Sequence, residues 1–589
     1  MPKPVPLERL IRAGRGLEPA DLVLRGGTVL NVFSGELLRA DVAIADEHVV
    51  GFGSGYIGRE EMDVSGLILL PGFIDGHLHI ESSLVEVPQF ARAVVPLGTT
   101  SVVADPHEIA NVMGIEGLRY MMESSKYNPL NVFFMLPSCV PATSLESTGS
   151  SLRAFDLFPF FQERWVLGLA EVMNYPGVLN LDEDLLDKIK IASDKRVDGH
   201  APGLSGKDLN AYVATGVSSD HECTSREEAE EKLRAGMYVM IREGSAAKNL
   251  ADLLPLVNEG NSRRFFFVTD DRHPHHLLSE GHLNHVIKTA IRQGLDPVLA
   301  VQMATINCAE YFGLRKLGAI APGRYADIVA IDNFEDFRVR LVFKNGQLVA
   351  RDGEAIWEEV PRPSPNLRGS MNLKWLEGDE FQIPAKGQLC RVIEVVPDQI
   401  VTRQRIEKAT VLNGQVISDP ERDLLRLFVL DRHRASGNVG KGLVKGLGLR
   451  RGALASSIAH DSHNVIAVGV EDEDIFRAVV TVNKMGGGLV VAADGQVLEQ
   501  LELPIAGLMS KLSVREVSER LRRLNEAAAE LGVRLKDPFM ALSFLALPVI
   551  PELKLTDMGL VDVERSELVS LFVDEPSWEG NREGGLGIG

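Results

Sequence analysis

The stretch Pro71-Gly72-Phe73-Ile74-Asp75-Gly76-His77-Leu78-His79-Ile80-Glu81 decides the fold, because an apolar run ends there in two histidines one residue apart. Pro71 and Gly72 interrupt any helical pattern, so the run is predicted to be a strand. Residues at i and i+2 of a strand point to the same face, so His77 and His79 can reach one metal ion together. A lone His-x-His pair also arises by chance, so residues further along the chain must show whether this pair belongs to a metal site.

Eight short apolar runs, including this one, are each followed by a segment of helical composition. Strands that alternate with helices predict parallel pairing, and eight of them in this length fit a closed β/α barrel. We therefore predict an α/β fold built on an eight-stranded TIM-type barrel. The runs cover residues 72–80, 99–105, 132–138, 166–172, 197–201, 218–222, 237–244 and 265–271.

Most of these runs end in ionisable residues. A buried strand has no packing reason to finish in such a group, and the C-terminal ends of barrel strands meet at one mouth of the barrel. The sequence therefore predicts one polar site at that mouth. Its expected metal ligands are His77, His79, Glu171, His200, His221 and Asp270.

Four histidines and two carboxylates could hold two divalent ions, with Glu171 of the fourth strand bridging them. Mixed imidazole and carboxylate ligation suits Zn, Mn or Fe rather than Ca or Mg, and it does not choose among the first three. Such a pair polarises a bridging water into hydroxide near neutral pH. We expect Asp270 to act both as a ligand and as the base that accepts the proton of the water.

Further units are predicted on both sides of the barrel. Alternating apolar and polar residues at 21–30 and 40–45 predict a small antiparallel sheet, and the pattern returns at 326–332 and 339–346, which indicates one discontinuous β-sandwich domain. After the linker-like prolines at 361, 363 and 365, new patterns predict a C-terminal α+β domain with an amphipathic helix at 514–527. The expected boundaries are 1–70 and 319–365 for the small β domain, 71–318 for the barrel and 366–589 for the C-terminal domain.

The composition of the chain limits the kinds of partner that it can bind and the compartment that it fits. A formal net charge of −20 over 589 residues argues against non-specific binding to nucleic acid or anionic membrane, because both are polyanions. There is no secretory leader pattern and no apolar run long enough to span a bilayer. The four cysteines have neither zinc-knuckle spacing nor the density of a disulfide scaffold, so we expect a cytoplasmic protein. We also expect a homodimer or a higher homo-oligomer.

These motifs resemble a known family. The stretch from Pro71 to His79, followed by the strand-end Glu, His, His and Asp, resembles the amidohydrolase superfamily of metal-dependent hydrolases, and residues 318–327 agree. Within it the chain resembles the bacterial adenine deaminases over essentially its whole length. The narrower resemblance is carried by His-Ile-Glu-Ser-Ser (79–83), Asp-Pro-His-Glu-Ile (105–109), Gly-Leu-Ala-Glu-Val-Met (168–173), Asp-Gly-His-Ala-Pro-Gly (198–203), Thr-Asp-Asp-Arg (269–272), His-Asp-Ser-His-Asn (460–464) and Leu-Pro-Ile-Ala-Gly-Leu-Met-Ser (503–510).

The resemblance implies hydrolysis of the free base adenine to hypoxanthine and ammonia, as part of purine salvage. It also implies that Glu171 stands where many relatives carry a carboxylated lysine. We expect two divalent transition-metal ions, with Mn²⁺ or Fe²⁺ ahead of Zn²⁺. The predicted catalytic residues are Asp270, Glu171, His221, Glu108 and Asp105, and the predicted substrate-binding residues are His107, Glu81 and Arg242.

Several alternatives stay open at this point. A cyclic amidase of the dihydroorotase or hydantoinase kind would use the same metals, and a non-catalytic barrel scaffold could dispense with the ligands. Arg242 and Glu243 could form a structural ion pair instead of binding substrate. We expect His273, His275 and His276 to be solvated loop histidines. The His460, Asp461 and His463 motif could hold a second metal, close over the barrel mouth or fix the domain interface.

Overall fold

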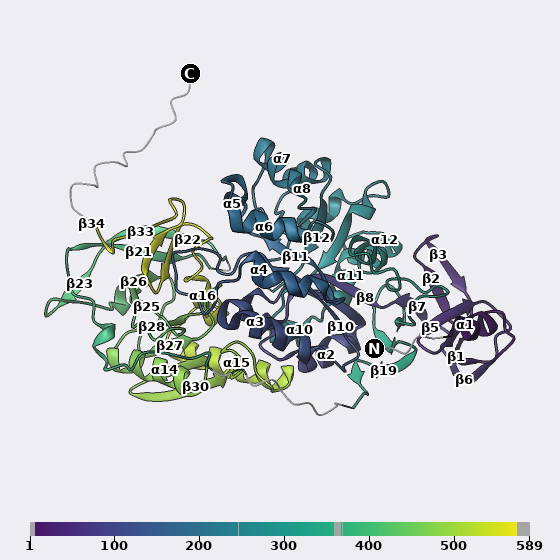
Figure 1. Ribbon diagram of the computed structural model, residues 1–589. Coiled ribbons are helices and arrows are strands. Elements are labelled where there is room, and N and C mark those ends of the chain that lie inside the picture. The colour runs from purple at the N-terminus through teal and green to yellow at the C-terminus, as the bar shows by residue number, and fades with distance from the viewer. Residues whose placement is uncertain (1–5, 246, 359–366, 368, 398, 574–589) are drawn as a thin grey trace, which may run out of the picture.

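The computed structural model describes residues 6–245, 247–358, 367, 369–397 and 399–573. Three units follow one another across the molecule: a small β domain, a barrel and a C-terminal domain. Figure 1 shows the barrel in the middle, with the small β domain on one side and the C-terminal domain on the other. The predicted proline linker at 361–365 lies outside the described residues.

The barrel strands pair in chain order, and all of them are parallel. They are β8 (Phe73–His79), β9 (Thr99–Ala104), β10 (Asn131–Pro137), β11 (Val166–Val172), β12 (Arg196–Gly199), β13 (Ser219–Asp220), β14 (Tyr238–Arg242) and β15 (Phe265–Val268). After a break at Thr269 the chain continues as β16 (Asp270–Asp271), which pairs with β8 and closes the barrel. With β15 and β16 counted as one broken strand, the predicted eight-stranded barrel is confirmed.

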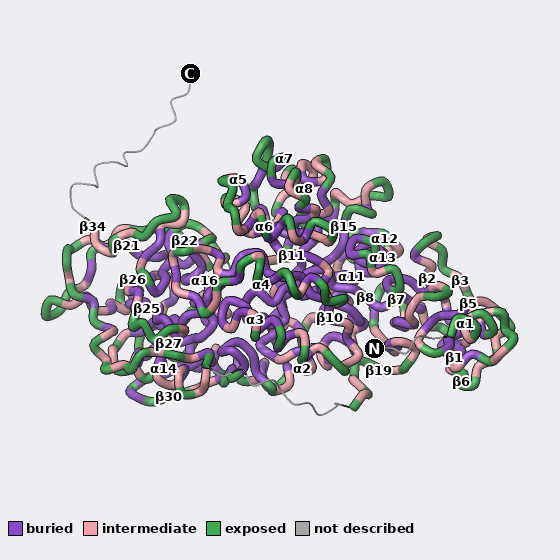
Figure 2. The backbone as a smooth tube through the Cα atoms, viewed as in Figure 1, coloured by how far each residue is buried: buried purple, intermediate pink, exposed green. Residues whose placement is uncertain are grey.

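Side chains of the strands alternate between the inside and the outside of the barrel. Phe266 of β15 packs in the inner cluster with Met135, Met240 and Val103, whereas its neighbours Phe265 and Phe267 belong to the outer cluster under the helices. This period of two explains why the strands read as nearly continuous apolar runs, since both faces are covered. Figure 2 shows the buried backbone concentrated in the barrel and in the centre of the C-terminal domain.

Helices between the strands form the outer layer of the barrel, as Figure 1 shows for several of them. Among them is α3 (His107–Ser124), which begins directly after the second strand and so brings its first residues to the barrel mouth. Other helices of this layer are α2 (Val87–Val94), α6 (Glu183–Ile191), α7 (Gly206–Ala214), α8 (Arg226–Arg234) and α11 (Leu283–Arg292).

The small β domain is discontinuous. One sheet contains β1 (Ala20–Arg25) and β4 (Val42–Ala45), and a second, mixed sheet joins β2 (Thr28–Asn31) and β7 (Ile68–Pro71) to the returning strands β17 (Ile328–Ile331) and β18 (Val339–Lys344). The prediction that residues 21–45 form one antiparallel sheet is wrong for β2. Gly26, with a φ of 72°, turns the chain between β1 and β2 and sends β2 into the second sheet.

The C-terminal domain is α+β, as predicted. Its main sheet contains, in order of pairing, β22 (Thr402–Lys408), β21 (Leu389–Val395), β26 (Val439–Lys445), β25 (Leu424–Leu430), β28 (Val465–Gly469), β27 (Ala453–Ser456), β29 (Gly488–Ala493) and β30 (Gln496–Glu502). The helix α14 (Asp472–Lys484) packs on this sheet, and the predicted amphipathic helix is α15 (Val514–Glu530). Ser513 and Glu516 begin α15 with a capping box, and α15 also packs against the barrel helices α2 and α10 (Pro274–Ser279). In the described part of the chain, no helix combines the length and apolar character needed to cross a bilayer.

Close packing between β11 and β12 gives a test of the barrel. A Cβ added to Gly168 would lie 1.9 Å from the carbonyl oxygen of Arg196, and that backbone cannot move without separating the strands. We expect Gly168→Ala to destabilise the protein by about 1–3 kcal/mol, the range for overpacked sites, and to lower the midpoint of thermal unfolding. Gly260→Ala is the control, because its nearest atom is the flexible Asn258 side chain at 3.2 Å. Equal midpoints for the two variants would contradict the packing assigned to Gly168.

Candidate metal centre

The first strand presents two imidazoles to the barrel mouth. Asp75, fully buried, accepts hydrogen bonds from the His77 backbone N–H (3.3 Å) and from Thr269 Oγ1 (2.7 Å), which ties the first strand to the break in the last one. His79 Nδ1 lies 3.0 Å from the carbonyl oxygen of Asp105 and donates to it, so its Nε2 carries a free lone pair. His77 Nε2 is buried and makes no hydrogen bond. Both imidazoles therefore offer a ligand atom to the site.

Glu171, at the end of the fourth strand, divides its two carboxylate oxygens between two pairs of histidines. Oε1 lies 4.0 Å from His77 Nε2 and 3.4 Å from His79 Nε2. Oε2 lies 2.7 Å from His200 Nδ1 and 3.2 Å from His221 Nε2. Burial alone raises the pKa of Glu171, but the hydrogen bonds from His200 and His221 outweigh it and hold the pKa well below its usual range. The group is therefore a carboxylate placed between the two pairs.

Asp270 faces the first pair from the opposite side. Its Oδ1 lies 3.4 Å from His77 Nε2 and 3.2 Å from His79 Nε2, and its Oδ2 accepts a hydrogen bond from Arg242 Nη1 at 3.1 Å. Asp270 has a φ of 55°, which is uncommon outside glycine and often marks a functional position. Burial raises the pKa of Asp270, yet the nearby imidazoles and the guanidinium lower it well below its usual value.

Glu222 belongs to this site but was not predicted. Its Oε1 lies 3.7 Å from His200 Nδ1 and 3.4 Å from His221 Nε2, and its carboxylate forms an ion pair with Arg242. The signal was present in the sequence, because the sixth apolar run ends in Glu222 directly after His221. Nothing in the run itself separates this carboxylate from an exposed loop residue, because His221 and Glu222 follow the short strand β13 and the alternation of strand side chains does not extend to them.

Residues after the second strand lie against the same centre. His107 Nδ1 is 3.0 Å from Asp105 Oδ2 and 3.5 Å from Glu171 Oε1, so the structure brings His107 and Asp105 to the predicted site. Glu108 is buried and accepts a hydrogen bond from Ser82 Oγ at 3.3 Å. Burial, together with the charge of the neighbouring Glu81, raises the pKa of Glu108 well above its usual value.

The two remaining predicted substrate contacts differ in their surroundings. Glu81 is buried, its Oε1 accepts a hydrogen bond from the Ile109 N–H at 3.3 Å, and its Oε2 makes none. Arg242 is also buried, and its guanidinium is occupied by Glu222, Asp270 and Asn249. The alternative that Arg242 forms a structural ion pair is supported, but its partners are Glu222 and Asp270 and not Glu243.

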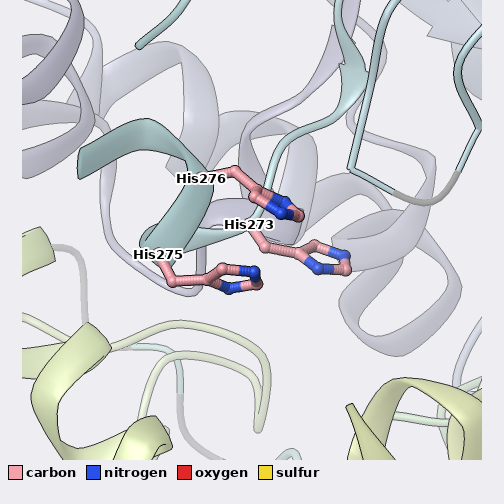
Figure 3. A group of neighbouring side chains, drawn as sticks. All are labelled: His273, His275 and His276. Carbon is pink, nitrogen blue, oxygen red and sulfur yellow. The ribbon is translucent and has the colours of Figure 1, made fainter. Parts of the chain in front are cut away.

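A separate group of histidines lies at the start of α10. Figure 3 shows the imidazoles of His273, His275 and His276, and one ring nitrogen of each lies within 4.8 Å of the others. His273 is buried and the other two are half-buried, so the prediction of solvated loop histidines is wrong. The reason is contact with the C-terminal domain, since Asp537 Oδ2 lies 3.6 Å from His273 Nδ1.

The donor set at the barrel mouth fits divalent metal ions. Imidazole nitrogens and carboxylate oxygens converge within 4.8 Å in the groups His77, His79 and Asp270 and His77, Glu171 and His221. The buried Nε2 of His77 makes no hydrogen bond, which is costly unless a further partner binds there. Mixed nitrogen and oxygen ligation of this kind suits Mn, Fe or Zn. The chain therefore carries a candidate metal centre.

Comparisons with known proteins agree with this geometry. Residues 68–349 match the model of the Amidohydrolase family, and residues 399–567 match the Adenine deaminase C-terminal domain. The chain is 51% identical to Adenine deaminase 2 of Carboxydothermus hydrogenoformans over 96% of this chain and 99% of that protein. It is 50% identical to an adenine deaminase of Desulfatibacillum aliphaticivorans, with the same two coverages.

The barrel and the match of residues 68–349 to the Amidohydrolase family define a metal-dependent hydrolase of the amidohydrolase superfamily. Membership in that superfamily implies the use of divalent metal. The similarity to the adenine deaminases extends over nearly the whole length of both chains and includes the C-terminal domain, so it assigns the chain to one family within the superfamily. The chain belongs to the adenine deaminase family, and the resemblance stated from the sequence is confirmed.

The shared carboxylate of Glu171 gives the second prediction. Replacing it with neutral Gln removes a negative charge between two cations, so metal occupancy should fall at both positions together. We expect Glu171→Gln, purified from metal-supplemented cells, to hold less than about half of the wild-type metal by elemental analysis. Glu243→Gln is the matched control, as a buried strand-end glutamate that accepts a hydrogen bond from the Leu250 N–H and should keep full occupancy. Full metal content in Glu171→Gln would show that this carboxylate does not bridge.

Proposed function

We propose that the chain catalyses the hydrolytic deamination of adenine to hypoxanthine and ammonia. The observation that carries the proposal is the 51% identity to an adenine deaminase across 96% of the chain, over a barrel mouth in which all six expected ligands meet. Water adds at C6 of the purine, and the bond from C6 to the exocyclic nitrogen breaks as ammonia leaves. The reaction belongs to purine salvage, and the substrate partner is a small purine base.

The proposed centre holds two divalent ions, Mn²⁺ or Fe²⁺ ahead of Zn²⁺. His77, His79 and Asp270 would hold one ion, His200 and His221 would hold the other, and Glu171 would be shared between them. Bound ions of this kind supply Lewis acidity and make water a competent nucleophile near neutral pH. The residues of the chain supply the proton transfers and the orientation of the purine.

Asp270 is the proposed base. Its pKa lies well below the usual value, so it is ionised at neutral pH and can accept the proton of the attacking water. The same carboxyl then returns the proton to the departing amine. Arg242 donates to Asp270 Oδ2 at 3.1 Å and thereby leaves Oδ1 facing the two histidines of the first strand. Because its guanidinium is occupied, we assign Arg242 to holding Asp270 rather than to the substrate.

The pKa of Glu108 is shifted in the opposite direction to that of Asp270. The raised pKa favours the protonated form, so Glu108 can donate a proton or a hydrogen bond to a ring nitrogen of the purine. His107, held by Asp105, and Glu81, with an unpaired buried oxygen, are the proposed neighbours of the ring. A donor beside the ring and a base beside C6 suit an aromatic amidine, in which negative charge moves onto the ring as water adds. The oligomeric state and the cytoplasmic location stay predictions.

Purified metal-loaded protein should convert adenine to hypoxanthine, measured as loss of adenine absorbance together with release of one ammonia per purine. Dihydroorotate and hydantoin serve as controls, because a cyclic amidase acts on them and has no use for an exocyclic amine. If the protein hydrolyses the cyclic amides and not adenine, it is a cyclic amidase and the proposed deaminase function is wrong. Fully metallated protein that acts on none of these substrates would favour a barrel scaffold.

A further inference from the structure

A loop of the C-terminal domain, residues 459–464, reaches the barrel mouth at Glu108. His463 Nε2 lies 3.7 Å from Glu108 Oε2, and His460 Nδ1 lies 4.0 Å from Glu108 Oε1. All three side chains are buried, and His463 Nε2 makes no hydrogen bond. Ser82 Oγ approaches Glu108 from the barrel side at 3.3 Å. The carboxyl of Glu108 is therefore enclosed between the barrel and the C-terminal domain.

The loop is held firmly from several directions. The fully buried Arg432 donates from Nε to the carbonyl oxygen of His463, and Asn464 Nδ2 donates to the carbonyl oxygen of Ser147, on a barrel loop, at 2.8 Å. The ring of His460 stacks on Phe544 with centroids 4.7 Å apart. A loop fixed to both domains can hold a neighbouring side chain in one orientation.

A second contact places the C-terminal domain beside the same part of the site. The N–H of Glu86 donates to the carbonyl oxygen of Ser510 at 3.0 Å, and the N–H of Ser510 donates to the carbonyl oxygen of Leu84 at 2.8 Å. These residues follow the segment that carries Glu81 and Ser82. The C-terminal domain therefore contacts the barrel on both chain segments that surround Glu108.

The cluster of Glu108, His460 and His463 has the residue types of a metal site, but the proton of His463 argues against one. The N–H of Ala459 donates to His463 Nδ1 at 3.3 Å, so Nδ1 carries the lone pair and the proton of the neutral ring is on Nε2. A protonated Nε2 cannot bind a metal, but it can donate a hydrogen bond. The acceptor in front of it is Glu108. A small rotation of the carboxyl closes the 3.7 Å gap, as catalytic hydrogen bonds often tighten when substrate binds.

We propose that His463 is a positioning residue, which orients Glu108 toward the purine through an Nε2–H donor, so that the C-terminal domain supplies part of the active site. The inference rests on the proposed deaminase function and goes beyond it. It assigns a role in turnover to a residue outside the barrel. Burial lowers the pKa of His463 well below its usual value, which keeps the ring neutral with a single donor on that side.

The test compares His463→Met, His463→Gln and wild-type holoenzyme with adenine as substrate. Met fills the space without a donor, whereas the amide N–H of Gln can replace Nε2–H. We expect kcat to fall roughly 10- to 100-fold in His463→Met, the scale for a misplaced catalytic group, with KM changed less than about threefold. His463→Gln should recover most of kcat. Asp474→Asn, a buried change in α14 on the main sheet, is the control and should leave both constants unchanged.

A double-mutant comparison separates positioning from a general loss of structure. If His463 acts through Glu108, adding His463→Met to Glu108→Gln should lower kcat by less than about twofold further. The inference is overturned if the two substitutions lower kcat multiplicatively in the double variant. It is also overturned if kcat of metal-loaded His463→Met stays within twofold of wild type. If His463→Met does not fold, His463→Leu, which also has no hydrogen-bond donor, replaces it in the same double-mutant comparison. Wild-type protein inactive on adenine would overturn the proposed function and this inference together, which is a distinct result.

Discussion

The carboxylate of Glu171 has to remain ionised while almost wholly removed from water, and the rest of the site is arranged around that constraint. A buried carboxylate is tolerated only where several partners replace its hydration. Here two oxygens meet four imidazoles contributed by three strands. Only a closed barrel brings the ends of the first, fourth, fifth and sixth strands to one point. The contacts between Glu171 and the four imidazoles therefore require the closed barrel, and the proposed metal centre is built on the same contacts.

A layer of buried aspartates beneath the strand ends keeps these ligands in place. Asp75 supports the first strand through the His77 N–H, and Asp220 accepts hydrogen bonds from the N–H groups of Ala201 and Glu222, each next to a histidine ligand. Lys232, fully buried on α8, compensates the charge of Asp220 at 3.0 Å. Because each aspartate has hydrogen-bond or ion-pair partners within the core, the protein itself holds the candidate ligands in place.

Periodicity was enough to predict the barrel, because each strand is an apolar run closed by a turn and followed by a helix. The candidate ligands were chosen from the recurrence of ionisable residues at strand ends, and the structure brings these side chains together. Glu222 could not be chosen in this way, since it and His221 follow the two-residue strand β13, where strand alternation no longer assigns side chains to a face. Contacts between distant segments, such as Asp537 with His273, also leave no local pattern. The division of residues 21–45 between two sheets depended on the backbone at Gly26, where propensity allows several turns.

Anomalous diffraction from crystals of Mn²⁺-loaded protein tests most directly whether Glu171 is shared by two metal ions. A shared Glu171 predicts two anomalous peaks, one within about 2.0–2.3 Å of each of its oxygens, the distance range of metal–carboxylate bonds. The first peak should also contact His77 and His79, and the second His200 and His221. A single peak, or two peaks of which either fails to contact Glu171, would show that Glu171 is not shared by two metal ions.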